Sequence, residues 1–93
     1  MIRSFADAKT ERIWNRDRSR LLPPDIQQRA MRRLTLLDSA QSLEELAHIK
    51  GNRLHALQGD RAGQHAIAIN MQWRVCFLWK DGDAYDVEIA DYH

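Results

Sequence analysis

The chain has 93 residues, 44% of them apolar, and a formal net charge of +1. This length predicts one domain over residues 1–93, with a thin core because small proteins bury a smaller share of their surface. No apolar run approaches the ~20 residues of a membrane span, and the first residues lack the apolar stretch of a secretion signal. Cys76 is the single cysteine, which excludes an internal disulfide and cysteine-rich zinc sites. A soluble, cytoplasmic protein is expected.

The small net charge hides a difference between the two halves of the chain. Residues 1–53 carry eleven Lys and Arg against seven Asp and Glu, whereas residues 54–93 carry three against six. Between positions 12 and 33, seven arginines face only two aspartates. Because the arginine guanidinium suits phosphate oxygens, this segment is either a solvated helical face or a surface for nucleic acid or another anionic partner.

The first half of the chain predicts one strand and two or three helices. Residues 2–5 read as a short strand, and Asp7 is placed to cap a helix that runs to about Asn15. Pro23-Pro24 marks the next boundary, because the residue before a proline avoids helical angles and a proline fits the first turn of a helix.

The second helix is the clearest element. Its apolar residues recur at helical spacing and form one stripe, made of Ile26, Ala30, Leu34 and Leu37. The nearby basic residues fall largely off that stripe, so its burial would expose Arg29, Arg32 and Arg33. Ser42 then begins a possible capping box for a short helical turn that ends near His48.

From residue 53 onward the apolar pattern has a period of two, which predicts an antiparallel sheet. The expected strands are residues 53–57, 65–69, 73–79 and 84–89, with a turn over 59–63 and a hairpin at Asp81-Gly82. In the third strand one face is apolar, and the other carries Arg74, Cys76 and Leu78. In the last strand, alternate residues with apolar side chains share one face, namely Tyr85, Val87 and Ile89.

These elements predict an α+β fold, in which the N-terminal strand and two to three helices pack on one face of the sheet. The opposite face must then hold Arg74 and, if the register permits, His55.

Four histidines are the main candidates for chemistry. His48 follows a short amphipathic turn and His65 alternates with core residues, so both are expected to be structural. His55 differs, because a period of two places it beside the cation Arg53. The terminal Asp91-Tyr92-His93 adds groups that accept, donate and exchange protons, and with His55 they would form a compact acid–base set.

Two other kinds of chemistry compete for these residues. Two histidines and an aspartate are possible metal ligands, but the pairwise spacings that favour a metal site are missing. Cys76 lies between apolar neighbours in a strand, which is typical of an inert core residue. We expect neither a metal ion nor a cofactor.

Four segments resemble, in order along the chain, the HigB-type toxins of the RelE/ParE superfamily, also called plasmid-maintenance killer proteins. They are RLHALQGDRAGQ (53–64), NMQWRV (70–75), DGDAYDV (81–87) and the terminal DYH, and residues 1–5 and 36–40 fit as well. The resemblance implies a RelE-like α+β toxin of a type II toxin–antitoxin system, which enters the ribosomal A site and cleaves mRNA during translation. It also implies a HigA-like helix-turn-helix antitoxin, through which alone operator DNA is contacted, and no membrane partner.

Carried over position by position, the resemblance assigns catalysis to His55, Asp91, Tyr92 and His93. The residues expected to bind phosphate are Arg53, Arg61 and Arg74. Those expected to contact ribosomal RNA or the antitoxin are Arg29, Arg32 and Arg33. The chain departs from the family at Gln58, where lysine is common, near Ala62, where a basic residue is usual, and at His65, where an aromatic residue is usual. The first two departures reduce positive charge, and cleavage rate or codon choice would change as a result.

The expected reaction is attack by the ribose 2′-OH on the adjacent phosphodiester, which needs a base, an acid and cations but no metal ion. His93 is the better candidate for the acid, because its own carboxylate and Asp91 would favour the imidazolium. Either Asp91 or His55 would be the base, and Tyr92 would orient the phosphate or stack on a nucleobase.

Two other functions stay open from the sequence. One is a ParE-like poison of DNA gyrase, which would cut no RNA and give no role to Tyr92 or His93. The other is a non-catalytic module that acts only as a co-repressor with its antitoxin, which the reduced charge at Gln58 and Ala62 keeps open.

Overall fold

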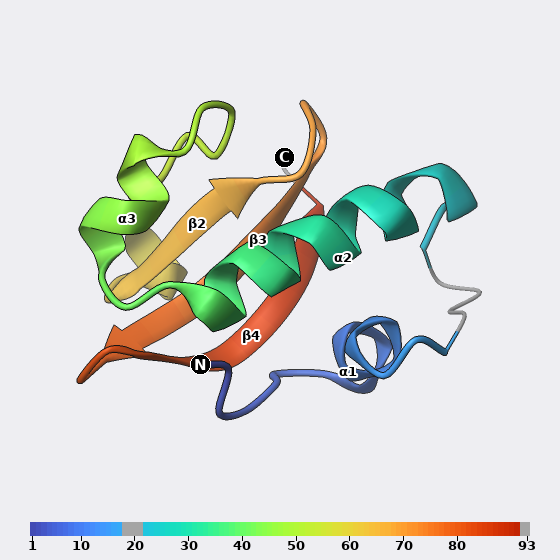
Figure 1. Cartoon of the computed structure of the whole chain (residues 1–93), viewed down its shortest axis with the longest axis horizontal. Coiled ribbons are helices and arrows are strands. Elements are labelled where there is room, and N and C mark those ends of the chain that lie inside the picture. The colour runs from blue at the N-terminus through green and yellow to red at the C-terminus, as the bar shows by residue number, and fades with distance from the viewer. Residues whose placement is uncertain (18–21, 92–93) are drawn as a thin grey trace.

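The computed structural model describes residues 1–17 and 22–91, and three helices pack against one face of a four-stranded antiparallel sheet (Figure 1). The strand order is β1-β2-β3-β4. The elements are α1 (Ala8–Trp14), α2 (Pro24–Ser39), α3 (Leu43–His48), β1 (His55–Ala56), the 3-10 turn η1 (Gly59–Arg61), β2 (Gln64–Ala68), β3 (Trp73–Lys80) and β4 (Asp83–Asp91). The expected α+β class is confirmed. Within the described ranges, no helix is long and apolar enough to cross a membrane.

Side-chain caps begin two of the helices, as the sequence predicted. Asp7 Oδ1 accepts the backbone N–H of Thr10 at 2.9 Å at the start of α1, and Ser42 Oγ accepts the N–H of Glu45 at 3.2 Å at the start of α3. The second half of the expected capping box is displaced by one residue. The Glu45 carboxylate accepts the N–H of Gln41, which precedes the cap, at 3.1 Å.

The core lies between α2 and the sheet. The whole predicted stripe of α2 is buried, and α3 contributes Leu46. The sheet contributes alternate residues of its strands, among them Ile67, Val75, Phe77, Val87 and Ile89. Burial of one such side chain stabilises the fold by about 1.5–3 kcal/mol. Because these apolar side chains lie on one face of the sheet, the helices cover that face.

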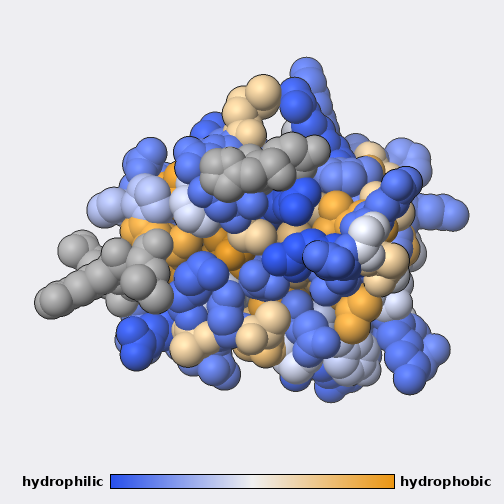
Figure 2. Space-filling view, turned by 180° about the vertical axis from the view of Figure 1, so that it is seen from behind, coloured by the Kyte–Doolittle hydropathy of each residue, from blue (hydrophilic) through white to orange (hydrophobic). Residues whose placement is uncertain are grey.

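The opposite, open face of the sheet carries a small second cluster of Ala66, Cys76 and Ala90, with Leu57 packed against it. Figure 2 shows the molecule from that side, where hydrophilic residues surround patches of apolar surface. Cys76 is fully buried there, and its burial raises the pKa of the thiol. This agrees with the inert role expected for Cys76.

The first expected strand is shorter than the sequence predicted. Of the expected strand 53–57, only His55 and Ala56 form β1, and they pair with Ala66 and His65 of β2. Arg53 has φ +49°, a left-handed conformation that does not continue a strand, so the extended segment begins after it. At the other end of the sheet, β4 extends two residues beyond the expected strand and ends at Asp91.

A β-bulge in β4 overturns one prediction about the faces of the sheet. Cys76 pairs with Glu88 but Leu78 pairs with Tyr85, so β4 holds one more residue than β3 in this interval. Asp86 has φ +51° at that point. The alternation therefore changes phase, and Tyr85 shares the open face with Leu78 instead of joining Val87 in the core.

The bulge also explains why the expected N-terminal strand is not continuous. Ile2 and Phe5 form isolated parallel bridges with Ala84 and Val87, on either side of the bulge. Between the bridges the Ser4 hydroxyl accepts the N–H of Asp86 at 2.9 Å, in place of a backbone partner. The N-terminal segment thus runs along β4 without forming a regular strand.

Thr10 is a buried polar residue that the sequence analysis missed. Its side chain is fully buried in α1, and its Oγ1 accepts the N–H of Ile89 at 2.9 Å. This hydrogen bond attaches α1 to β4 two residues before Asp91.

The Asp7 carboxylate should make stability depend on pH. Burial alone would raise the pKa of Asp7, but the hydrogen bonds from Thr10 and Lys9 and the charge of Lys9 lower it overall below its ordinary value of 3.8. Because the pKa of Asp7 is lower in the folded state, its carboxylate contributes its full stabilisation at pH values above the ordinary pKa. This contribution is lost as the pH falls through the lowered pKa of the folded state. In urea unfolding, Asp7→Asn keeps a capping oxygen but should be less stable than wild type near neutral pH. The deficit should shrink in acid, and a deficit that is constant with pH would contradict this origin.

Candidate active site

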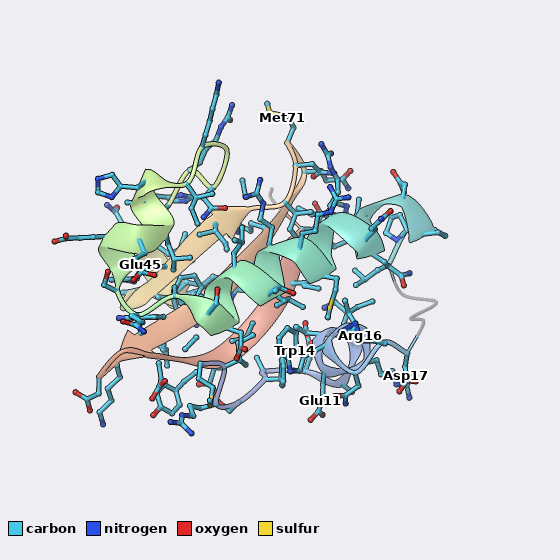
Figure 3. The ribbon with its side chains drawn as sticks, in the orientation of Figure 1. Glu11, Trp14, Arg16, Asp17, Glu45 and Met71 are labelled. Atoms are coloured by element: carbon cyan, nitrogen blue, oxygen red, sulfur yellow. The ribbon has the colours of Figure 1, made fainter. Side chains whose placement is uncertain are left out.

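A hollow of about 360 Å³ opens where β2 ends and β3 begins. It is lined by Arg53, His55, Ala68, Asn70, Met71, Trp73 and Arg74. The turn between β2 and β3 carries Met71, which is 82% exposed and points outward from this end of the sheet (Figure 3).

The turn that forms one wall of this hollow is held by Asn70. Its Oδ1 accepts the N–H groups of Gln72 at 2.8 Å and Trp73 at 2.7 Å. Asparagine often closes a turn in this way. The wall is therefore built by local hydrogen bonds.

His55 lies on the open face, as the sequence predicted. It pairs with Ala66, which pairs in turn with Cys76, so its side chain shares the face of Arg74. Its Nδ1 lies 3.0 Å from the carbonyl oxygen of Arg53. Because a carbonyl only accepts, this hydrogen bond places the ring hydrogen on Nδ1. The basic nitrogen of the neutral ring is then Nε2.

Two arginines stand beside His55 in the hollow. Arg74 is half-buried on the open face, paired in register with Ala68 and Ala90. Arg53 is exposed, and its Nη1 lies 3.8 Å from the sulfur of Met71. The small side chains of the two alanines leave room above the sheet next to these cations.

Asp91 stands at the same end of the sheet but is not one of the residues that line the hollow. It pairs in register with Trp73, and its Oδ2 accepts from Gln72 Nε2 at 3.3 Å. Tyr92 and His93 follow directly and lie outside the described residues. The structure thus brings together three of the predicted residues, Arg53, His55 and Arg74, whereas Asp91 lies at the same end of the sheet, in register with Trp73, and outside the hollow.

Arg61 is engaged elsewhere. Its Nη1 and Nη2 donate to the two carboxylate oxygens of Glu88 at 3.1 and 3.2 Å, and Nη1 also donates to Gln64 at 3.1 Å. The hydrogen bonds to Glu88 raise the pKa of the guanidinium. Arg61 therefore holds η1 against β4, and it would have to leave Glu88 to bind a phosphate with its fork.

Asn52 is the second buried polar residue that the sequence analysis missed. Its side chain is fully buried, its Nδ2 donates to the carbonyl of Leu46 at 3.0 Å, and its Oδ1 accepts from Arg33 Nη1. Gly51 and Asn52 together signal a turn in the sequence, but no periodic pattern announces the burial of one asparagine. Its contacts place Arg53 at the edge of the hollow.

The two other histidines within the described residues behave as expected. His48 is exposed and its Nδ1 lies 2.7 Å from the carbonyl of Glu44, within α3. His65 is half-buried and stacks on Phe77, with ring centroids 6.2 Å apart. Among the described residues, no three His, Cys, Asp or Glu side chains gather as metal ligands.

Comparison with known proteins identifies the fold and the family. A solved structure of a YafQ mutant from E. coli superimposes with a TM-score of 0.63 at 14% identity, covering 98% of this chain and 91% of that chain, which shows the shared fold. A family model described as the RelE-like toxin of type II toxin–antitoxin system HigB matches residues 3–93. The fold and this match define a RelE-like toxin of a type II toxin–antitoxin system. The chain belongs to the HigB-like toxin family, which implies an antitoxin partner.

Two curated relatives extend along most of the chain. Toxin HigB-1 from Vibrio cholerae serotype O1 is 38% identical over 85 residues, 90% of each chain. Endoribonuclease HigB from Proteus vulgaris is 32% identical over 93 residues, the full length of both. The resemblance that the sequence motifs predicted is confirmed.

Removing the Asn52 side chain should weaken the fold at the site. Asn52→Ala leaves a buried carbonyl and the Arg33 guanidinium without this partner, so we expect a loss of about 1–3 kcal/mol in the free energy of unfolding. Urea unfolding measures this loss. Asn15→Ala, at the exposed end of α1, is the matched control and should change stability by less than about 0.5 kcal/mol. Equal stability of the two variants would contradict the role of Asn52.

Proposed function

We propose that this HigB-family toxin is an endoribonuclease that cuts mRNA on the ribosome, with the hollow beside His55 as its active site. The observation that carries the proposal is the hydrogen bond from His55 Nδ1 to a backbone carbonyl, because it leaves Nε2 as a base next to two arginines. The name of the relative from Proteus vulgaris, Endoribonuclease HigB, supports the same activity.

In the proposed reaction the ribose 2′-oxygen attacks the adjacent phosphorus and the bond from phosphorus to the 5′-oxygen breaks. The products are a 2′,3′-cyclic phosphate and a 5′-hydroxyl, and no metal ion takes part. His55 Nε2 accepts the proton of the 2′-hydroxyl. Arg74 and Arg53 stabilise the extra negative charge on the phosphorane, an effect often worth about 3 kcal/mol.

An acid must give a proton to the leaving 5′-oxygen. We assign this role to His93, two residues after Asp91, because a neighbouring carboxylate favours protonated histidine. Tyr92 orients the phosphate or stacks on a nucleobase. The departures at Gln58 and Ala62 do not remove the cations of this site, because Arg53 and Arg74 line the hollow and neither Gln58 nor Ala62 does.

The partners follow from the same proposal. The substrate is mRNA in the ribosomal A site, which places the toxin in the cytoplasm. The inhibitor is a HigA-like helix-turn-helix antitoxin, and operator DNA is contacted only through it. The exposed Arg29 and Arg32 and the half-buried Arg33 of α2 face ribosomal RNA or the antitoxin.

Mapping of RNA ends separates the possible functions. The purified chain is added to a translation extract and to the same mRNA without ribosomes, and the 5′ ends are located by primer extension. We expect new ends within codons only when ribosomes are present. DNA gyrase poisoning without new RNA ends would support a ParE-like activity instead. The absence of both effects would leave only a co-repressor role.

Substitution of single histidines tests the proposed roles in catalysis. His55→Ala and His93→Ala should each slow single-turnover cleavage on programmed ribosomes by about 100-fold or more, the usual size of an acid–base effect. His48→Ala, which removes an exposed histidine of α3, is the matched control and should cleave at the wild-type rate. Wild-type rates in the His55 variant would show that the base is another group.

A further inference from the structure

Two more hollows continue from the candidate active site toward α2. The first has a volume of about 290 Å³ and shares Arg53, Ala68, Asn70 and Met71 with the site. The second has a volume of about 240 Å³ and shares Arg29, Arg33 and Ile69 with the first. Because each hollow shares lining residues with the next, the three adjoin in a row from His55 to α2, and we call this row the groove.

The charge of this groove is of one sign. Arg29, Arg32, Arg33, Arg53 and Arg74 line it along its length, and among the described residues that line it none is an aspartate or glutamate. A row of cations without interspersed carboxylates attracts a polyanion more strongly than a mixed surface does.

One of these arginines is held in a fixed position. Arg33 Nη1 donates to Asn52, which is itself fully buried and bonded to Leu46. The Arg33 Nη2 lies 3.2 Å from where a Cβ on Gly51 would stand. Gly51 also has φ +91°, so glycine both permits the turn and leaves space for the guanidinium. A donor fixed in advance loses less entropy when it binds a ligand.

We propose that Arg29, Arg33 and Arg53 form a subsite for a backbone phosphate of RNA, one step along the groove from the candidate active site. The inference rests on the proposed ribonuclease function, because that function supplies a strand that enters the groove at His55. The phosphate comes either from the strand that is cut or from ribosomal RNA next to it, and its chemistry is the same in both cases.

The electrostatics of Arg33 agree with an anion at this position. Burial, and then the charge of Arg29 one helical turn away, lower the pKa of the Arg33 guanidinium. Two like charges at this spacing destabilise a helix. A phosphate between them would replace this repulsion by attraction, and a single-stranded RNA bound there would release counterions.

The test is binding of a single-stranded, 2′-O-methylated RNA that cannot be cut, measured by fluorescence polarisation over a range of salt. Arg29→Met and Arg33→Met should each weaken binding by about tenfold. Each should also reduce the slope of log affinity against log salt by about 0.7. Lys80→Met removes one exposed positive charge at the opposite end of β3 and should leave both quantities unchanged.

Arg33→Met removes a hydrogen bond to Asn52 and could fail to fold, whereas Arg29→Met leaves that hydrogen bond in place. Arg29→Met therefore keeps the test valid. Binding of Arg29→Met that equals that of Lys80→Met would overturn the proposal. The proposal would also be overturned if the arginine variants bound RNA as wild type does but bound the antitoxin more weakly, because the groove would then be a protein-binding surface. A second experiment measures binding of the same variants to vacant ribosomes without mRNA. Weaker binding of the arginine variants than of wild type to these ribosomes assigns the phosphate to ribosomal RNA.

Failure of this inference and failure of the proposed function give different results. If the wild-type chain cuts no mRNA on ribosomes, the proposed function fails whatever the arginine variants bind. If the wild type cuts mRNA and the arginine variants bind RNA as it does, the subsite alone is rejected.

Discussion

One buried asparagine, Asn52, holds Arg33 directly and fixes the chain just before Arg53. Each of the four polar atoms of Asn52 has a partner: Ile49 in the chain just before it, Ala68 of β2, Leu46 of α3 and Arg33 of α2. Two helices and a strand therefore meet at one residue, in surroundings where an unpaired polar group costs about 1–3 kcal/mol. Arg53 follows it directly, so its place beside the sheet is fixed by hydrogen bonds made one residue earlier.

The unusual backbone of Arg53 connects this anchor to the chemistry. With φ at +49°, the residue turns the chain into β1, and its carbonyl reaches Nδ1 of His55. A non-glycine residue rarely adopts this conformation, and it persists where surrounding contacts over-determine it. The same residue thus presents a guanidinium to the hollow and sets the tautomer of His55. In the proposed ribonuclease, this arrangement prepares the base before RNA binds.

Sequence patterns predicted the helices, the alternation along β3 and the position of His55 and Arg74 on one face, because these depend on caps and on periods that extend over many residues. The exchange of faces at Tyr85 was not predictable, since one residue of positive φ at Asp86 reverses the alternation without any change in composition. The anchor at Asn52 was missed for a similar reason. A single buried polar residue has no period, and its partners lie on other elements. Family resemblance supplied the proposed catalytic roles, while the tautomer of His55 required coordinates.

The chemistry at the 2′-hydroxyl tests the central claim most directly. A defined mRNA with a single 2′-deoxynucleotide at the mapped cut site is translated with the wild-type toxin, and the product ends are identified by mass spectrometry. If His55 acts as the base on the 2′-hydroxyl, the all-ribose mRNA yields a 2′,3′-cyclic phosphate and a 5′-hydroxyl, and the deoxy position is not cut. Cleavage at the deoxy position with an unchanged rate would contradict the claim.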